Sequence, residues 1–264
     1  MKKLFLAVAL LATSLVASAQ HASFYVSYHS LGVGEYADWL DDIDADNENL
    51  NGFSIGFNKA FSISSSVPLF IEVGAGLTYA WAKYFEDMDI LSGECIAGGY
   101  YYDEWYDEYY YYGCGGEWDV TASVVAHHLM VNVPVNFMYK IKFPNSSITL
   151  EPYVGLNLRG HILGKEVAKF DYNACCNDMD DALEDGLDEI DEEDYNQDYF
   201  DKKDMGGKKY VANRFNIGWQ IGANVDFGPA FVGVSYGSDF NKYAKWNGEE
   251  FKFNALNVTV GVRF

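Results

Sequence analysis

The last nine residues, Leu256-Asn257-Val258-Thr259-Val260-Gly261-Val262-Arg263-Phe264, alternate strictly between apolar side chains and polar or small ones. Successive side chains of a β-strand point to opposite faces of the sheet, so this pattern predicts a strand whose two faces differ. One face is wholly apolar, and the other consists of Asn, Thr, Gly and Arg. The segment therefore indicates a strand that separates an apolar environment from a crowded polar one.

Seven further segments repeat this alternation. They are residues 23–33, 52–61, 69–81, 120–143, 148–163, 212–227 and 230–240. Their polar faces carry mainly Gly, Ser, Asn and Thr, whereas the solvated face of a soluble β-sandwich would be rich in Lys and Glu. The resulting eight strands are an even number, as in single-chain bacterial outer-membrane barrels. The predicted fold is all-β, an eight-stranded antiparallel transmembrane β-barrel.

The connections between these strands alternate between long and short. The long ones are residues 34–51, 82–119, 164–211 and 240–252, and the short ones are 62–68, 144–147 and 228–229. Outer-membrane barrels have short periplasmic turns and long extracellular loops. We therefore expect the four long segments outside the cell and both chain ends in the periplasm.

The acidic residues follow the same division. The chain has 39 Asp and Glu residues and a formal net charge of -21, yet outside the four long segments only Glu72, Glu151, Asp226 and Asp239 are acidic. The predicted walls are thus nearly free of acids, and the predicted loops are strongly acidic. The chain has no basic stripe that could neutralise phosphates, which argues against nucleic acid as a partner.

The N-terminus has the pattern of a Sec signal peptide over residues 1–19. Lys2 and Lys3 precede an apolar stretch over residues 4–16, and Ala17-Ser18-Ala19 is a cleavage motif of small residues. No stretch reaches the roughly 20 consecutive apolar residues of a membrane-spanning helix. We therefore expect export by the Sec route and a mature barrel domain over residues 20–264 in the outer membrane of a Gram-negative bacterium.

The strand motifs also resemble a known family. Residues 128–142 contain Val133-Pro134-Val135 and Tyr139-Lys140-Ile141, and after one turn Glu151-Pro152-Tyr153-Val154-Gly155 follows. Together with residues 212–227 and the C-terminal Val260-Gly261-Val262-Arg263-Phe264, these elements resemble the PorT-like (OMP_b-brl) outer-membrane β-barrel family. The resemblance implies an outer-membrane location, and the members that give the family its name are linked to protein secretion and surface assembly. It carries no catalytic motif and does not extend to the long loops.

The interior of an eight-stranded barrel is just wide enough for side chains to fill it. Antiparallel pairing across the turn at Asn145 sets Lys140 opposite Glu151, with both side chains inward. Buried charges need partners, so we expect an internal polar network. Its predicted members are Glu72, Lys140, Glu151, Arg159, Arg214, Asp226 and Arg263. Such a network favours a closed lumen, and the alternative is a narrow, gated ion path.

The same pairing brings His128 near His161 at the outer end of the lumen. Two imidazoles within reach of each other are able to hold a transition metal, although the sequence supplies no clear third ligand. Polar filling of the lumen is the alternative interpretation.

The four cysteines all lie in predicted extracellular loops: Cys95 and Cys114 in the second, and Cys175 and Cys176 in the third. Since the chain passes through an oxidising periplasm, disulfides are expected. A bond between the adjacent Cys175 and Cys176 is strained. This favours either a bridge from Cys95 to Cys114 or two bridges between the loops.

The first loop contains Asp42-Ile43-Asp44-Ala45-Asp46, and the D-x-D-x-D spacing of Asp42, Asp44 and Asp46 gathers oxygen ligands of the kind that Ca²⁺ prefers. A complete EF-hand loop has Gly at its sixth position and Glu at its twelfth, where this chain has Asn47 and Phe53. A specific Ca²⁺ site is one hypothesis, and diffuse attraction of cations by all the acidic loops is the other. No other cofactor is expected.

The second loop is dense in tyrosine. Its prominent aromatic residues are Tyr101, Tyr102, Trp105, Tyr106 and Tyr110. Recognition surfaces favour Tyr because it offers a large amphipathic contact at low cost in conformational entropy. These residues therefore predict either a partner-binding surface or a lid packed on the barrel rim.

The sequence best fits a non-enzymatic barrel, anchored in outer-membrane lipid, whose acidic, Tyr-rich loops bind an extracellular or periplasmic protein partner or cations. A narrow passive channel or a component of secretion and surface assembly is the alternative. A rim-sited enzyme would need Ser, His and an acid together. His29 with Ser27 or Ser30 is the nearest candidate, and the long loops contain no His.

Overall fold

The computed structural model describes residues 21–32, 49–95, 99–103, 108–112, 116–174, 183–184, 187, 197–201, 212–246 and 249–264. Within these residues no helix is both long and apolar enough to cross a membrane. Eight long strands carry the architecture: β1 (His21–Gly32), β2 (Asn49–Ser62), β3 (Leu69–Cys95), β6 (Gly116–Tyr139), β8 (Thr149–Asn173), β10 (Phe215–Asp226), β11 (Ala230–Asp239) and β14 (Asn254–Arg263). The short strands are β4 (Gly99–Asp103), β5 (Glu108–Tyr112), β7 (Ile141–Lys142), β9 (Gln197–Asp198), β12 (Ala244–Trp246) and β13 (Glu249–Phe251).

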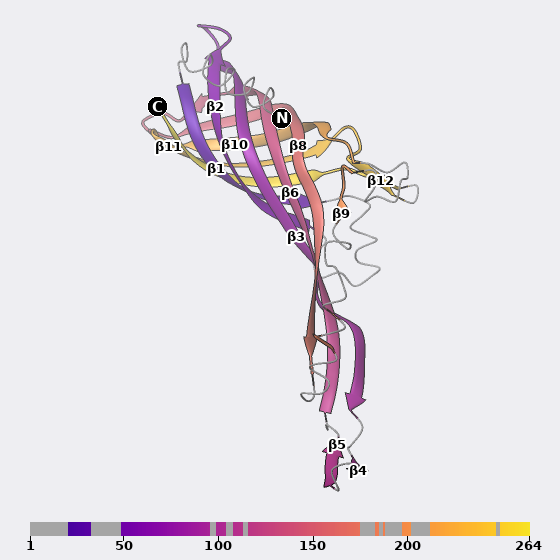
Figure 1. Cartoon of the computed structure of the whole chain (residues 1–264). Coiled ribbons are helices and arrows are strands. Elements are labelled where there is room, and N and C mark those ends of the chain that lie inside the picture. Colours follow the sequence, from indigo (N-terminus) through magenta and orange to yellow (C-terminus); the bar gives the residue numbers. More distant parts are fainter. Residues whose placement is uncertain are drawn as a thin grey trace.

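The eight long strands pair as a closed antiparallel ring. Their order is β10-β11-β14-β1-β2-β3-β6-β8, and β8 pairs again with β10. The two ends of the chain meet where β1 pairs with β14, with Ser23 opposite Arg263. Figure 1 shows the strands curving around a common interior. The closed antiparallel sheet agrees with the sequence prediction.

The ring is polar inside and apolar outside. Along β2, Ser54 is 3% exposed whereas its neighbour Ile55 is 53% exposed. Along β8, Glu151 is 0% exposed whereas Val154 is 56% exposed. A soluble protein buries its apolar side chains, so this arrangement is the reverse of the usual one.

Outward-facing aromatic rings gather near both ends of the wall. At one end Tyr28 packs edge-on against Phe53 at 5.6 Å between ring centroids, and Tyr79 stacks on Trp81 at 5.7 Å. At the other end Phe57 and Phe264 lie 6.4 Å apart. Between these two aromatic levels the outer face is mainly aliphatic, as at Ile55 and Val260.

Short turns close the ring at the end that holds Phe264. Asn145 between β7 and β8 has a φ of 60°, and Gly228 between β10 and β11 has a φ of 97°. Asn tolerates the left-handed region better than most residues, and Gly adopts it freely. The Gly228 amide donates a hydrogen bond of 2.9 Å to the Asp226 carboxylate, which fixes the second turn. The predicted short connections are present at all three positions.

Three strands extend far beyond the ring. β3, β6 and β8 continue together as a twisted ribbon that projects away from the barrel (Figure 1). The sequence prediction ended the strand of β3 at residue 81 and that of β8 at residue 163, and it began the strand of β6 at residue 120. It was therefore wrong about these three boundaries. Register shifts between Lys83 and Leu91 break the period-2 pattern that defines a strand, which explains the error.

Parts of the predicted loops are regular as well. Within 82–119, β4 and β5 form a hairpin that sets Tyr101 opposite Tyr110. Within 240–252, β12 and β13 form a second hairpin. Local hairpins of this kind hydrogen-bond their own backbone, so they form whether or not their side chains alternate in polarity.

Two tyrosines reach into the lumen across glycines on the neighbouring strand. Tyr25 lies opposite Gly56, and a Cβ built on Gly56 would lie 2.4 Å from the Tyr25 ring. Tyr153 lies opposite Gly222 in the same way, with 2.6 Å to its ring. The missing side chains of these glycines make room for rings that cross the narrow interior.

We predict that Gly56→Ala destabilises the barrel by about 1–3 kcal/mol, because the added methyl overpacks the Tyr25 ring. Urea unfolding of the refolded chain, followed by circular dichroism, measures the change. Gly160→Ala is the matched control, since its Cβ would meet nothing nearer than 3.9 Å, and we expect it to stay within about 0.5 kcal/mol of wild type. Equal losses in both variants would contradict the packing argument.

Candidate functional site

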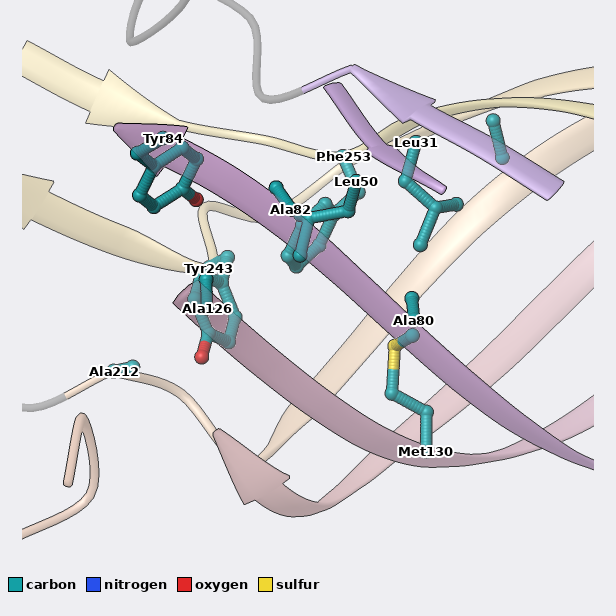
Figure 2. Close-up of a cluster of buried hydrophobic side chains, with 11 residues drawn as sticks. Leu31, Leu50, Ala80, Ala82, Tyr84, Ala126, Met130, Ala212, Tyr243 and Phe253 are labelled. Atoms are coloured by element: carbon teal, nitrogen blue, oxygen red, sulfur yellow. The ribbon is translucent and has the colours of Figure 1, made fainter. Parts of the chain in front are cut away.

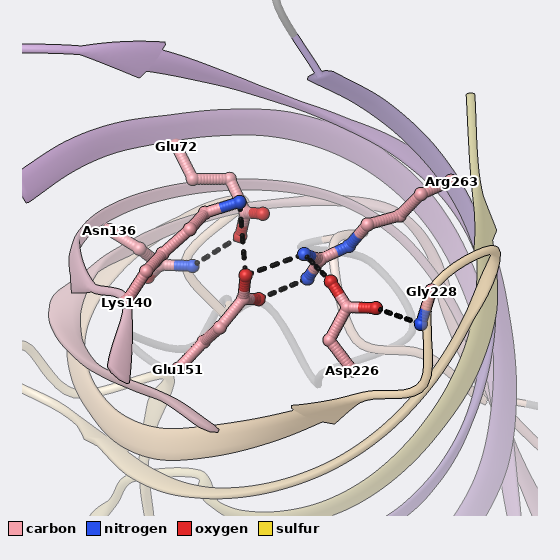
Figure 3. A network of polar contacts seen from close by, with 7 residues as sticks. All are labelled: Glu72, Asn136, Lys140, Glu151, Asp226, Gly228 and Arg263. Atoms are coloured by element: carbon pink, nitrogen blue, oxygen red, sulfur yellow. Dashed lines mark hydrogen bonds and ion pairs between the residues drawn. The ribbon is translucent and has the colours of Figure 1, made fainter. Parts of the chain in front are cut away.

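A cluster of ion pairs closes the lumen at the end with the short turns. Glu151 lies at its centre, between Lys140 and Arg263 (Figure 3). The Lys140 ammonium is 3.0 Å from Glu151 Oε1, and Arg263 binds both oxygens of that carboxylate. Arg263 also donates to Asp226 at 2.5 Å. Because Glu151 is completely buried, these two cations replace the water that its charge would otherwise need.

The cluster ties distant strands together. Glu151 is on β8 and Arg263 is on β14, and in the ring β10 and β11 lie between them. Glu72 of β3 lies beside the cluster (Figure 3) and accepts a 3.2 Å hydrogen bond from Asn136, whose own oxygen accepts one of 2.6 Å from Gln220. These contacts cross the lumen, so the cluster acts as a plug between opposite walls.

Five of the seven residues predicted for the network thus lie together: Glu72, Lys140, Glu151, Asp226 and Arg263. Two predicted members lie elsewhere. Arg159 instead donates to both oxygens of Asp239, at 3.0 and 3.1 Å. Arg214 is exposed, with its guanidinium 4.1 Å from the centre of the Phe200 ring.

The sequence analysis missed Asp239 as a partner, although it is one of only four acids outside the long segments. Arg159 and Asp239 are both buried and form a second ion pair nearer the opposite end of the lumen. Their strands β8 and β11 are not adjacent, since β10 lies between them. Pairing rules for neighbouring strands therefore could not identify this contact.

A polar cavity of about 80 Å³ lies in the lumen. It is lined from most strands of the ring, among others by Ser54, Thr78, Asn132, Arg159 and Asn257. A polar cavity of this size has room for a few water molecules. This small cavity fits the expectation that side chains fill a ring of eight strands.

His29 lies in this polar interior. Its Nε2 is 2.6 Å from the Ser54 hydroxyl, and its Nδ1 contacts the Asn257 carboxamide oxygen. Ser27, one of the two serines that the sequence analysis considered, instead forms a hydrogen bond with Thr259. A Ser–His–Asn chain has the connectivity of a nucleophile relay, but here it faces the lumen and not the rim.

The end of the lumen opposite the ion-pair cluster is filled by apolar and aromatic side chains (Figure 2). We call these residues the mouth cluster: Leu31, Leu50, Ala80, Ala82, Tyr84, Ala126, Met130, Ala212, Tyr243, Phe253 and Ala255. Phe253 and Tyr243 come from the segment between β11 and β14, and Tyr199 and Phe200 from the segment between β8 and β10 pack against them. The described residues 197–201 and 241–246 of two predicted loops therefore pack against this end.

His128 and His161 both lie against the mouth cluster, with ring centroids 6.3 Å apart. Tyr243 lies 4.7 Å from the His161 ring and 5.7 Å from the His128 ring. Among the described residues no group of three or more His, Cys, Asp and Glu side chains is arranged to hold a metal ion. The surroundings of the two imidazoles are mainly aromatic, so the structure offers filling of the lumen as their role.

A buried hydrogen bond anchors the segment over the mouth. The Tyr199 hydroxyl donates to the Glu166 carboxyl group, which extends from the part of β8 beyond the ring. Burial raises the pKa of Glu166 and of the Tyr199 hydroxyl, because charge is disfavoured there. The pair joins the segment 197–201 to the extended strand β8.

Several predicted site residues lie outside the described part of the chain. This applies to the signal peptide over residues 1–19, to the predicted Ca²⁺ ligands Asp42, Asp44 and Asp46, and to Cys114, Cys175, Cys176, Trp105 and Tyr106. Cys95 is the last residue of β3, opposite Gly116. The disulfides and the Ca²⁺ site therefore stay predictions.

Comparison with known proteins yields only distant similarity. No family model matches the chain, and no curated protein matches it. It is similar to the outer membrane enzyme PagL, with 13% identity and a TM-score of 0.39 over 90% of this chain and 98% of that one. It is also similar to Neisserial surface protein A (NspA), with 10% identity and a TM-score of 0.34 over 92% of this chain and 96% of that one.

The N-terminal β-barrel domain of Pseudomonas aeruginosa OprF is similar at 11% identity and a TM-score of 0.28, over 92% of this chain and 97% of that one. TM-scores in this range carry no argument about function. Because no family model matches, the resemblance to the PorT-like family stays a prediction.

We predict that Glu151→Gln destabilises the barrel by about 3–5 kcal/mol, because it leaves two buried cations without their shared carboxylate. Urea unfolding of the refolded chain measures the loss. Lys142→Gln removes an exposed charge two residues from Lys140 and should change stability by less than about 0.5 kcal/mol. If the two variants unfold at the same urea concentration, the ion-pair cluster does not stabilise the ring.

Proposed function

We propose that the protein is a non-enzymatic outer-membrane β-barrel that spans the membrane with its ring and presents acidic, Tyr-rich segments outside the cell. There they bind a protein partner or cations. The observation that carries this proposal is the reversed polarity of the ring. Exposed Ile55, Val154 and Val260 surround buried Ser54 and Glu151.

Membrane insertion follows from that polarity. In hydrocarbon every backbone polar group needs an internal partner, and a closed ring of antiparallel strands supplies one for each. An apolar band between aromatic levels suits lipid chains between two headgroup layers. In water the same outer face would be a very large apolar patch.

The two ends of the ring suggest its orientation. The short turns near Phe264 suit the periplasmic side, and the extended ribbon of β3, β6 and β8 suits the cell surface. This orientation also places the acidic segments outside, where they meet soluble partners. It implies export, which the predicted signal peptide would provide.

The segments beyond the ring carry the proposed binding function. The β4–β5 hairpin lies at the far end of the ribbon (Figure 1), and its sequence contains a run of tyrosines. A rigid ribbon that holds tyrosines away from the membrane favours recognition of another macromolecule. The same proposal includes two further features of these segments. One is cation binding by Asp42, Asp44 and Asp46, and the other is disulfide formation among Cys95, Cys114, Cys175 and Cys176. The bound partner in this proposal is a component of secretion or surface assembly if the resemblance to the PorT-like family extends to function.

A narrow passive channel is the second candidate, because the lumen contains a polar cavity. The ion-pair cluster and the mouth cluster lie on either side of that cavity and leave no large passage. Conduction would require both to open. The geometry therefore favours display of the outer segments over transport.

We predict that a protease site inserted between Asp103 and Glu108 is cleaved on intact cells that produce the protein. The same site inserted at Asn145 should be cleaved only after the outer membrane has been permeabilised, because that turn is expected in the periplasm. Immunoblotting of the fragments measures both results. Equal cleavage at the two positions on intact cells would refute the proposed membrane placement.

For the binding role, we predict that deletion of residues 99–112 lowers partner capture by more than about ten-fold, because binding energy concentrates on a few aromatic residues. Affinity capture from surface-exposed material, followed by mass spectrometry, gives the readout. Deletion of residues 244–251 removes the other hairpin and serves as the control. An unchanged set of captured proteins after the first deletion would remove the Tyr-rich hairpin from the proposal.

A further inference from the structure

One row of outward side chains marks the place where the aliphatic wall ends. Trp81, His127 and Lys165 lie opposite one another on the neighbouring strands β3, β6 and β8. The adjacent row toward the turns consists of Tyr79, Leu129 and Leu163. Side chains directly opposite on one face lie about 5 Å apart at their Cβ atoms. The Lys165 cation thus lies one row above an apolar surface and opposite the His127 ring.

His127 is held in a defined orientation. Its ring stacks on Tyr79 at 6.1 Å between centroids, and the Tyr79 hydroxyl lies 2.7 Å from its Nδ1. Trp81 also stacks on Tyr79, at 5.7 Å between ring centroids. When the tyrosine hydroxyl donates to Nδ1, the ring proton lies on Nε2, which is then available as a donor.

Two exposed lysines of β8 lie on the same face as this imidazole. Lys165 is directly opposite His127, and Lys169 lies two rows farther along the strand, opposite Ser123. Lys83 of β3 is on that face as well, and the carboxylates that share it, Asp89 and Asp171, lie one row beyond Lys169. A gathering of basic groups is notable in a chain with 18 Lys and Arg against 39 Asp and Glu. The positive groups thus lie nearest the membrane level, and the acids lie farther out.

We propose that His127, Lys165 and Lys169 bind the phosphate group of an anionic lipid in the outer leaflet. The two ammonium groups and the imidazole N–H donate to phosphate oxygens, which form strong charge-assisted hydrogen bonds. The acyl chains of the same lipid lie on Leu129 and Leu163 below. Basic side chains beside an aromatic belt suit a lipid headgroup, because they meet its charge and its apolar part at the correct depths.

A soluble acidic protein would fit this surface less well. Its binding would leave the aliphatic row at Leu129 and Leu163 without a partner. A lipid satisfies the aliphatic row and the lysines together. This inference rests on the proposed membrane insertion of the ring.

The test uses the full mature chain refolded into phosphatidylcholine vesicles that contain spin-labelled phosphatidic acid or spin-labelled phosphatidylcholine. Electron spin resonance measures the fraction of each labelled lipid that the protein immobilises. The wild-type protein should select phosphatidic acid, and Lys165→Gln with Lys169→Gln should lower that selectivity by about five-fold per lysine. Lys252→Gln lies on the segment before β14 and serves as the matched control, with selectivity unchanged.

The outcomes separate the inference from the proposed function. Resistance of the ring strands to added protease reports insertion independently of lipid selectivity. An inserted wild-type protein without selectivity, or a double variant that keeps it, would overturn the headgroup site and leave the barrel standing. Competition by inorganic phosphate at millimolar concentration would show that the site prefers free phosphate, which also overturns it. Failure of the wild-type protein to insert would instead overturn the membrane placement and the site together.

Discussion

The pairing of β8 with β10 is the contact on which the rest of the structure depends. It turns an open sheet into a ring and leaves the long strands without a free edge at the level of the barrel. Once the ring is closed, its inner face has no access to bulk water and its outer face has no second sheet to cover it. Every polar group inside must therefore find a partner inside, and every apolar side chain outside needs an apolar surrounding.

The narrow interior is filled in three layers. Ion pairs around Glu151 occupy the end with the short turns, a small polar cavity lies in the lumen, and the mouth cluster fills the opposite end. The two buried ion pairs at Glu151 and Asp239 each cross between strands that are not neighbours. They resist shearing of one wall against the other as well as neutralising buried charge. Because the interior is filled, we infer that the ring anchors the outer segments in the membrane and does not conduct solutes.

The described parts of the segments beyond the ring contain more regular structure than their composition indicates. Many acidic residues and interrupted alternation are typical of solvated loops. However, β3, β6 and β8 continue as a ribbon, because each extends the hydrogen-bond ladder that the ring has already started. Residues after Gln197 and around Phe253 pack into the mouth for a different reason, since their aromatic side chains complete a buried cluster. The same chain thus closes its barrel and projects a surface from it.

The sequence by itself determined the elements whose signal is local. Alternation along each strand located the walls, and Asn145 set the register that places Lys140 beside Glu151, because the two strands are joined by one short turn. Only the tertiary structure decided contacts between strands far apart in the chain, such as Arg159 with Asp239 and His29 with Asn257. These depend on the curvature and closure of the ring. The row of Trp81, His127 and Lys165 needs three strands in register across a β-bulge, and no pattern within a single strand contains that information.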